Sequence, residues 1–330
     1  MIATKARLVA VAKFLLGLAL LVAVVLWLIP GPDERRELVA RADLSGLYLF
    51  LGLVTTFIAC VVTSARWQLM AEDTMGGTRL PYHVYFHSLV LTRVLGQVSS
   101  TLVMDLVGRG MALRSAGSQR GLGHAVTQAI LERIFDIALP VMMLAWAVFA
   151  WRGAWDAPLA VASFTAVLLA FAGLAAVLLA PLTRLALRTY AALRRLRARL
   201  RRTPAADEPV LEAIPVPARL AVKIGLLSLV RYLAVLGLFW SIAAGIGLAF
   251  SFFQIAAATP LGQLAGMLGL TPGALGIQEA GWVGAFTWVG VDAIAIGLFV
   301  LCQRLISTAC FSLILLGSWL VLRRRSPAAG

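Results

Sequence analysis

TPGALGIQEAG, residues 271–281, places a proline, three glycines and a carboxylate inside a long apolar segment. Between Arg231 and Arg304 the only charged residues are Glu279 and Asp292. A Pro-Gly pair followed by further glycines is typical of a turn. Because an ionisable side chain inside a bilayer costs at least about 2.5 kcal/mol, a glutamate in such a place needs a partner or a task. The stretch therefore predicts a turn that carries a carboxylate, within a region otherwise suited to membrane helices.

The composition of the chain is that of an integral membrane protein. Of its 330 residues, 61% are hydrophobic and only 13% are charged, far from the composition of soluble domains. Several apolar runs reach the roughly 20 residues that a helix needs to cross a bilayer, which indicates an all-α polytopic helical bundle rather than a barrel. We expect about six full spans, at residues 8–29, 44–65, 124–151, 157–181, 220–248 and 292–322.

Positive charge exceeds negative charge, with 29 Lys and Arg against 15 Asp and Glu. These cations cluster beside apolar spans, so we attribute the excess to the cytoplasmic bias of membrane loops rather than to a nucleic-acid partner. Residues 182–218 hold the densest cluster, with eight arginines among Leu and Ala. This pattern predicts an amphipathic helix on an anionic, cytoplasmic lipid surface. A loop that only sets the topology is the simpler alternative.

The same segment divides the chain into two parts. We treat residues 1–330 as a single transmembrane domain, in which the Arg-rich cytoplasmic linker of about 182–218 joins a first half, about 1–181, to a second half, about 219–330. Three consecutive arginines, Arg323 to Arg325, follow the last apolar run. By the positive-inside rule we expect a multi-pass protein of a bacterial inner membrane, with cytoplasmic N- and C-termini.

Two apolar stretches fit full spans poorly, at residues 80–104 and 250–290. Polar residues break the first, and arginines on both sides, Arg66 and Arg109 among them, mark both of its ends as cytoplasmic. A segment that returns to its starting side is a re-entrant helical hairpin. The second stretch is broken at residues 271–281 and, by parity, enters from the opposite face. Two such hairpins in corresponding places predict an inverted-repeat transporter with a site near the midplane.

Each predicted hairpin leads into a helix that carries an arginine, Arg133 in the first half and Arg304 in the second. In the first of these helices Arg133 and Asp136 can pair, whereas Glu132 and Asp136 share a face and would repel each other. One carboxylate therefore needs a further cation. The candidates are Arg93, Arg109, Arg231 and Arg304. The cluster is either an ion network that locks helices together or part of a substrate path.

Glu279 also has two interpretations. It can cap the helix that follows the turn, where the helix dipole favours a negative charge. Alternatively, with Pro272, Gly273 and Gly276 opening the backbone, the turn can face a lipid headgroup and its amides can cradle an anion. The sequence leaves both open.

No pattern in the sequence indicates a metal or a cofactor. His83 and His87 are four residues apart, but no third ligand lies near them, so we expect an interfacial histidine pair. Cys60, Cys302 and Cys310 sit in apolar runs without CxxC spacing, so we expect free thiols. A nucleotide-binding loop and a nucleophile elbow are both missing from the sequence, and we predict no enzyme activity and no cofactor.

Two motifs resemble the lysylphosphatidylglycerol synthase transmembrane region, a family of flippase-like membrane proteins. The first is DLVGRGMALRSAG followed by AVTQAILERIFD, and the second is TPGALGIQEAG followed by an arginine-bearing span. The resemblance covers roughly residues 10–322. The first motif departs from the family's pattern: Ser or Thr replaces its proline, and Arg109 follows Asp105 by four residues instead of three.

The resemblance implies an inner-membrane protein that moves a lipid across the bilayer: aminoacyl-phosphatidylglycerol, or a polyprenyl-linked or hopanoid lipid. Because the sequence ends at RRRSPAAG, we expect no aminoacyl-transferase domain and hence transport rather than synthesis. The alternative is a membrane enzyme acting on polyprenyl-phosphate-linked sugars, with Asp105 and Glu132 as its acid and base, or an accessory subunit. Expected partners are the lipid substrate, anionic lipid at the Arg-rich linker, a second copy of the chain or a biosynthetic enzyme.

The predicted translocation path joins the charged residues of both halves to the polar residues of the second turn. As a hypothesis, Arg109, Arg133 and Arg304 contact a lipid phosphate. Glu132, Asp136 and Glu279 balance them and receive any cationic headgroup. The path residues are Arg93, Asp105, Arg109, Glu132, Arg133, Asp136, Gln278, Glu279 and Arg304.

Overall fold

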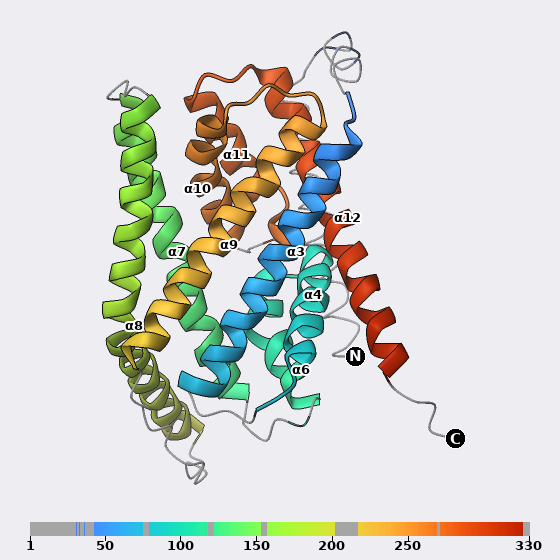
Figure 1. Cartoon of the computed structure of the whole chain (residues 1–330). Coiled ribbons are helices and arrows are strands. Elements are labelled where there is room, and N and C mark those ends of the chain that lie inside the picture. The colour runs from blue at the N-terminus through green and yellow to red at the C-terminus, as the bar shows by residue number, and fades with distance from the viewer. Residues whose placement is uncertain are drawn as a thin grey trace.

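The computed structural model describes residues 43–74, 79–115, 122–152, 157–201, 217–268 and 271–325, together with residues 31, 33, 36 and 117. Within these ranges every regular element is helical (Figure 1). The long helices are α3 (Gly46–Leu69), α7 (Leu122–Arg152), α8 (Ala157–Arg201), α9 (Ala218–Gly245) and α12 (Ala293–Arg325). The shorter elements are η1 (Met70–Thr74), α4 (Tyr82–Val98), α5 (Thr101–Val103), η2 (Met104–Gly108), α6 (Arg109–Ser115), α10 (Phe252–Leu268), η3 (Pro272–Ala274) and α11 (Ile277–Trp288).

Five helices of the described residues are long and apolar enough to cross a membrane: α3, α7, α8, α9 and α12. They coincide with five of the spans predicted from the sequence, which confirms a polytopic, all-helical membrane protein. The remaining predicted span, residues 8–29, lies outside the described residues. A helix of about 20 residues covers the roughly 30 Å hydrocarbon core, and each of the five contains an apolar window of 18 residues with at most two charged side chains.

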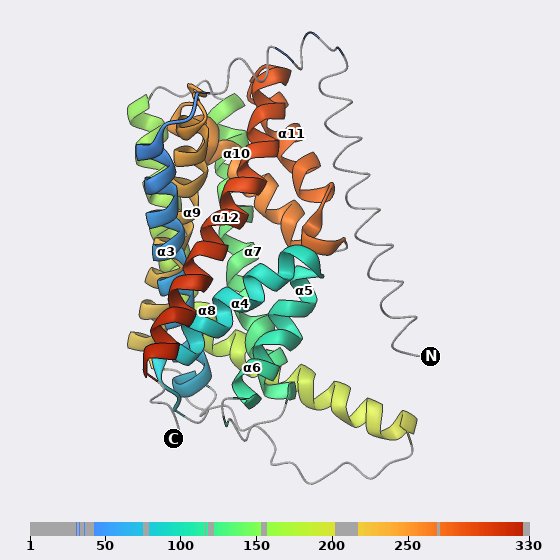
Figure 2. The same ribbon diagram turned by 90° about the vertical axis from the view of Figure 1, so that its right-hand side faces the viewer.

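The shorter helices form two groups that meet inside the bundle. In Figure 2, α4, α5 and α6 occupy the lower half of the molecule, whereas α10 and α11 occupy the upper half. The chain turns at two points: Ser99–Ser100 separates α4 from α5, and η3, within the predicted turn at residues 271–281, lies between α10 and α11. The two turns touch, since the Gly273 amide donates a hydrogen bond of 2.7 Å to the Ser99 carbonyl.

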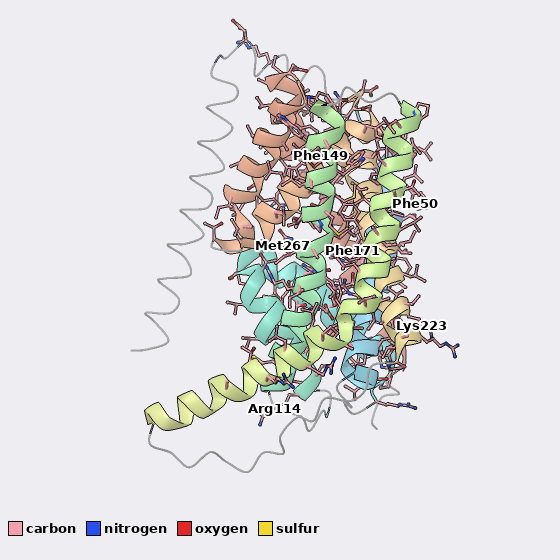
Figure 3. All side chains as sticks on the ribbon, turned by 90° about the vertical axis from the view of Figure 1, so that its left-hand side faces the viewer. Phe50, Arg114, Phe149, Phe171, Lys223 and Met267 are labelled. Atoms are coloured by element: carbon pink, nitrogen blue, oxygen red, sulfur yellow. The ribbon has the colours of Figure 1, made fainter. Side chains whose placement is uncertain are left out.

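The Arg-rich segment differs from the prediction in its start. We expected a span to end at Pro181 and a separate amphipathic helix to follow. Instead α8 continues through Pro181 to Arg201 as one helix of 45 residues. Proline removes one backbone hydrogen bond and tends to kink a helix, and the lower part of α8 turns away from the bundle (Figure 3). The remainder of the linker, residues 202–216, lies outside the described residues.

Close contacts between α10 and α11 hold the upper pair together. A Cβ at Gly262 would lie 2.4 Å from the Trp282 ring, and one at Gly281 would lie 2.5 Å from the Cβ of Ala265. Small residues allow such an approach between membrane helices, where packing and not the hydrophobic effect drives association. Trp282 is fully buried and stacks on Phe286 with ring centroids 5.6 Å apart. The helices α10 and α11 are therefore closely packed along their contact.

Replacing Gly281 with Ala should destabilise this packing, because the added methyl group collides with Ala265. Gly284 on the same helix is a matched control, since nothing lies within 4 Å of its added Cβ and Ala is favoured over Gly in a helix by about 1 kcal/mol. We expect Gly281→Ala to lower the melting temperature of the purified protein and Gly284→Ala to leave it unchanged or raise it. Equal melting temperatures for the two variants would show that the α10–α11 contact is not tight.

Candidate functional site

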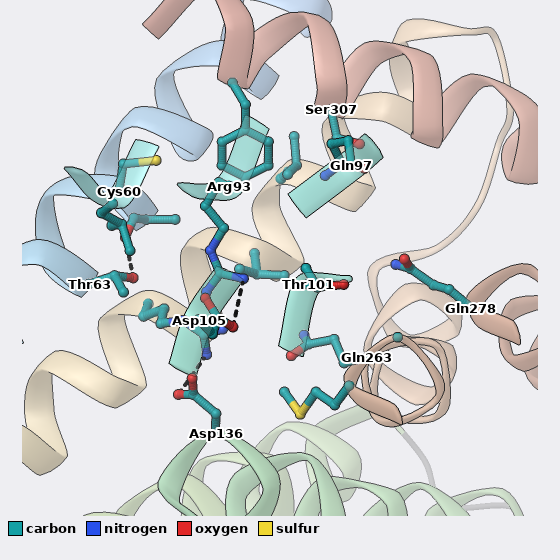
Figure 4. Close-up of a pocket in the computed structure, with 18 of the residues that line it drawn as sticks. Cys60, Thr63, Arg93, Gln97, Thr101, Asp105, Asp136, Gln263, Gln278 and Ser307 are labelled. Carbon is teal, nitrogen blue, oxygen red and sulfur yellow. Dashed lines mark hydrogen bonds and ion pairs between the residues drawn. The ribbon is translucent and has the colours of Figure 1, made fainter. Parts of the chain in front are cut away.

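A cavity of about 220 Å³ lies where the two groups of short helices meet (Figure 4). Its walls come from α3, α4, α5, η2, α6, α7, α9, α10, η3, α11 and α12. The lining includes every residue of the predicted path except Glu279. These residues are Arg93, Asp105, Arg109, Glu132, Arg133, Asp136, Gln278 and Arg304. Residues far apart in the sequence thus form one polar site inside an apolar bundle.

Glu132 is the first centre of the charge cluster. Its Oε2 lies 2.6 Å from Nη1 of Arg109 and 3.6 Å from Nη2 of Arg66. Arg109 in turn lies over the ring of Trp67, with its Cζ 5.2 Å from the ring centroid. All of these groups are buried. A short contact between an arginine and a carboxylate is a strong, charge-assisted hydrogen bond, so this pair fixes α6 to α7.

Asp136 is the second centre, one helical turn after Glu132. Its Oδ1 lies 2.8 Å from Nη1 of Arg66 and 3.1 Å from Nη1 of Arg231. Arg66 therefore bridges two carboxylates of α7 and also donates a hydrogen bond of 3.0 Å to the Ser228 hydroxyl on α9. These contacts connect α3, α7 and α9 and offset the repulsion that the spacing of the two carboxylates predicts.

Arg66 is a site residue that was not predicted from the sequence. We interpreted it as a cytoplasmic flanking charge, but its side chain is fully buried, with 0% of the residue exposed. Glu132 and Asp136 on α7 were the signal that could have identified it. Two carboxylates on one helix face need more than one cation, and any arginine near an apolar span was a candidate, Arg66 included. Arg66 lies in the last turn of α3, but the chain continues directly into the helical turn of η1, so the arginine is not at the end of the helical segment.

Asp105 on η2 contacts three arginines. Oδ1 lies 3.2 Å from Nη2 of Arg109, whereas Oδ2 lies 3.3 Å from Nη1 of Arg133 and 3.6 Å from Nη1 of Arg93. Arg133 thus pairs with Asp105, and not with Asp136 as its position on the helix had allowed. Asp136 is instead paired with Arg66 and Arg231 from α3 and α9.

Arg304 contacts the turn between α10 and α11. Its Nη2 donates a hydrogen bond of 2.6 Å to the Gly273 carbonyl, and its Nη1 lies 3.3 Å from Oε1 of Gln278. Gly273 has φ of 57°, a left-handed conformation that glycine adopts without steric cost. A Cβ there would also lie 2.6 Å from the Gln97 carbonyl. Glycine is therefore required both by the turn and by its contact with α4.

Glu279 caps the helix that follows the turn. Its Oε2 accepts a hydrogen bond of 2.7 Å from the Gly276 amide, and its Oε1 lies 3.4 Å from Nη1 of Arg304. The residue is 0% exposed and lies behind the cavity wall rather than in it. The amides of Gly273 and Ala274 also have acceptors within the protein. Of the two interpretations of Glu279, the geometry is that of the helix cap.

A second arginine contacts the same connection from the other side. Nη2 of Arg133 donates a hydrogen bond of 2.6 Å to the Met267 carbonyl, near the end of α10. Carbonyls in the last turn of a helix lack partners within the helix, so a cation there is favourable. The two arginines predicted from the repeat thus hold the backbone on both sides of the turn between α10 and α11.

His83, His87 and the three cysteines form none of the ion pairs described above. His87 Nδ1 is 2.9 Å from the Ser318 hydroxyl on α12. Both histidines line a second, mainly apolar groove between α3, α4 and α12. Among the described residues no group of three or more His, Cys, Asp or Glu could hold a metal ion. Cys60, Cys302 and Cys310 are free thiols, and Cys60 lines the cavity.

The fold and the cavity define a class: a polytopic helical membrane protein with a charged site inside its bundle. The model of the lysylphosphatidylglycerol synthase TM region matches residues 14–317, so the chain belongs to this family. The family is a membrane domain associated with the synthesis and translocation of aminoacyl-phosphatidylglycerol, which implies a phospholipid substrate. A comparison with curated protein sequences gave no match.

Replacing Arg66 with Ala should destabilise the protein by about 3–5 kcal/mol, because it leaves buried carboxylates without their cation. The melting temperature of the purified protein measures this effect. Arg36 is a control, since its side chain is 85% exposed and its contact with Asp33 is 3.6 Å long. We expect Arg36→Ala to leave the melting temperature unchanged. A stable Arg66→Ala variant would mean that Arg109 and Arg231 suffice to balance the carboxylates of α7.

Proposed function

We propose that the protein translocates a lipid headgroup across the membrane, in the manner of a flippase. The observation that carries this proposal is the arginine-lined cavity between the tips of the two groups of short helices. A buried cavity with this many charges is costly in a membrane protein and usually marks a substrate or ion path. Family membership supports the proposal by indicating a phospholipid substrate.

We interpret the two groups of short helices as re-entrant hairpins that enter from opposite faces. Their placement in opposite halves of the molecule (Figure 2) and the contact between Gly273 and Ser99 support this interpretation. An arginine follows each hairpin, on α7 and on α12, as an inverted repeat would require. Hairpins that meet near the midplane are typical of transporters in which two repeats move against each other.

We place the lower side of the bundle in the cytoplasm of a bacterial inner membrane. Arg114 and Lys223 lie at that side (Figure 3), as do the C-terminal end of α12 and the Arg-rich end of α8. The positive-inside rule assigns such a side to the cytoplasm. The C-terminus is then cytoplasmic, and the Arg-rich end of α8 faces the anionic leaflet.

In this proposal the arginines of the cavity contact the lipid phosphate while the acyl chains stay in the bilayer. Arg109, Arg133 and Arg304 line the cavity from three different elements. Arginine suits phosphate because its planar fork donates two parallel hydrogen bonds. Headgroup transfer then requires only that a polar path exists between the hairpin tips, so the polar headgroup never crosses bare hydrocarbon.

The alternative, an enzyme acting on lipid-linked sugars, finds less support in the geometry. Its acid and base would be Asp105 and Glu132. Both oxygens of Asp105 contact arginines, and Glu132 is buried against Arg109 and Arg66. Arginine keeps its positive charge in proteins, so both carboxylates are held in ion pairs, and neither is well placed to serve as the acid of such a reaction. We therefore favour translocation without chemistry.

Substituting Arg304 with Met should abolish lipid translocation, because it releases the Gly273 carbonyl and leaves Glu279 without its cation. The assay is the loss of fluorescence of a tail-labelled phospholipid in proteoliposomes when a membrane-impermeant quencher is added. Arg323→Gln is the control on the same helix, since Arg323 stacks on Trp319 away from the cavity. It should translocate at the wild-type rate.

Two results would contradict the proposal. If folded Arg304→Met protein, monodisperse in detergent, still translocated lipid at the wild-type rate, the cavity would not be the path. If wild-type protein moved no lipid but released product from a radiolabelled polyprenyl-phosphate sugar, the enzyme alternative would replace it. Activity seen only with an added glycosyltransferase would indicate an accessory subunit.

A further inference from the structure

The charges of the cavity cluster do not cancel. Six arginines meet four carboxylates, which leaves a net charge of +2 among the described residues of the cluster. The arginines are Arg66, Arg93, Arg109, Arg133, Arg231 and Arg304, and the carboxylates are Asp105, Glu132, Asp136 and Glu279. Buried charge without a counter-charge is expensive. The cluster is therefore most stable when an anion occupies the cavity.

The carboxylates, in contrast, have little capacity left for a cation. Each of the four lies within 3.6 Å of at least one arginine, and Asp105 contacts three. Glu132 Oε1 has no hydrogen-bond partner, but the other oxygen of the same group contacts Arg109 and Arg66. An ammonium group that approached Glu132 would meet these two guanidiniums as well. Like charges in a buried site repel strongly.

Buried hydrogen-bond donors add to the positive charge. The amide nitrogens of Gln263 and Gln303 and the Thr101 hydroxyl are buried and have no partner. All three residues line the cavity, and Gln263 lies beside the segment that carries Thr101 (Figure 4). Gln303 is 2% exposed and Gln263 is 9% exposed. Buried polar groups are nearly always satisfied, so orphaned donors at a cavity wall indicate a ligand with acceptor atoms.

Arg93 is the arginine best placed to contact such a ligand. It extends from α4 across the cavity towards Asp105 (Figure 4), and its contact with that residue, at 3.6 Å, is too long for a hydrogen bond. The other cavity arginines each have at least one partner at 3.3 Å or less. Arg93 can therefore turn to a new acceptor with the smallest loss of existing contacts.

From this balance of charge and donors we infer that the cavity selects a headgroup with a net negative charge. The ligand class is a phosphate-bearing lipid such as phosphatidylglycerol, rather than its cationic lysyl ester. The inference rests on the proposed translocation and specifies its substrate. A lysyl ester carries two ammonium groups beside one phosphate, so its net charge has the same sign as the cavity. Arg93, Gln263 and Gln303 are the residues that set this preference.

The test compares lipids with one labelled tail and three headgroups: phosphatidylglycerol, phosphatidylethanolamine and lysylphosphatidylglycerol. Translocation of each is measured in proteoliposomes with the full chain, and native mass spectrometry measures which lipid the purified protein retains. We expect phosphatidylglycerol to exceed the lysyl ester by about tenfold in both, as one or two charge-assisted hydrogen bonds would give. Arg93→Gln should reduce this preference, whereas Lys223→Gln, outside the cavity, should not.

Each result separates this inference from the proposed function. If the lysyl ester moves as fast as phosphatidylglycerol or faster, the charge selection is wrong while translocation stands. If no lipid moves, the proposed function fails. The lipid retained by the purified protein still tests the headgroup preference, and enrichment of the lysyl ester would overturn the inference of a net negative headgroup. A further arm adds inorganic phosphate to protein loaded with phosphatidylglycerol. Complete displacement would show that the site takes free phosphate, which would also overturn a lipid ligand.

Discussion

The structure depends on one constraint: a charged group inside an apolar bundle must find its counter-charge within the protein. Glu132 and Asp136 lie one turn apart on α7 and would repel each other if left alone. Arg66, Arg109 and Arg231 reach them from three other helices. Because the loss of any one partner leaves a buried charge, these contacts fix the positions of the helices relative to one another. The cavity is the space that this arrangement leaves open.

Much of the architecture could be predicted from the sequence, because the physics that sets it is local. Runs of apolar residues define membrane helices by length alone, and five predicted spans coincide with helices. The turn at residues 271–281 was also visible, since Pro272 and the glycines that follow it disrupt a helix wherever they occur. The sequence misplaced the end of α8, because a proline in a membrane helix can be tolerated and does not always end it.

The residues that line the site could be predicted from the sequence, but the ion pairs that they form could not. Most of the predicted path residues line one cavity, because any ionisable residue in an apolar span must face the interior of the bundle. Which cation meets which anion depends on helix rotation, and a single sequence carries no record of it. Arg133 therefore meets Asp105 instead of Asp136, and Arg66 was assigned to the membrane surface although it is buried.

The hydrogen bonds of Arg133 and Arg304 to the Met267 and Gly273 carbonyls link ligand binding in the cavity to the position of the connection between α10 and α11. Both guanidiniums line the cavity, so the donors that could bind a ligand are the same donors that hold the connection between α10 and α11. A ligand that recruits them competes with the backbone of that connection. Occupancy of the cavity and the position of the turn then share one free-energy balance, and neither can change without an effect on the other.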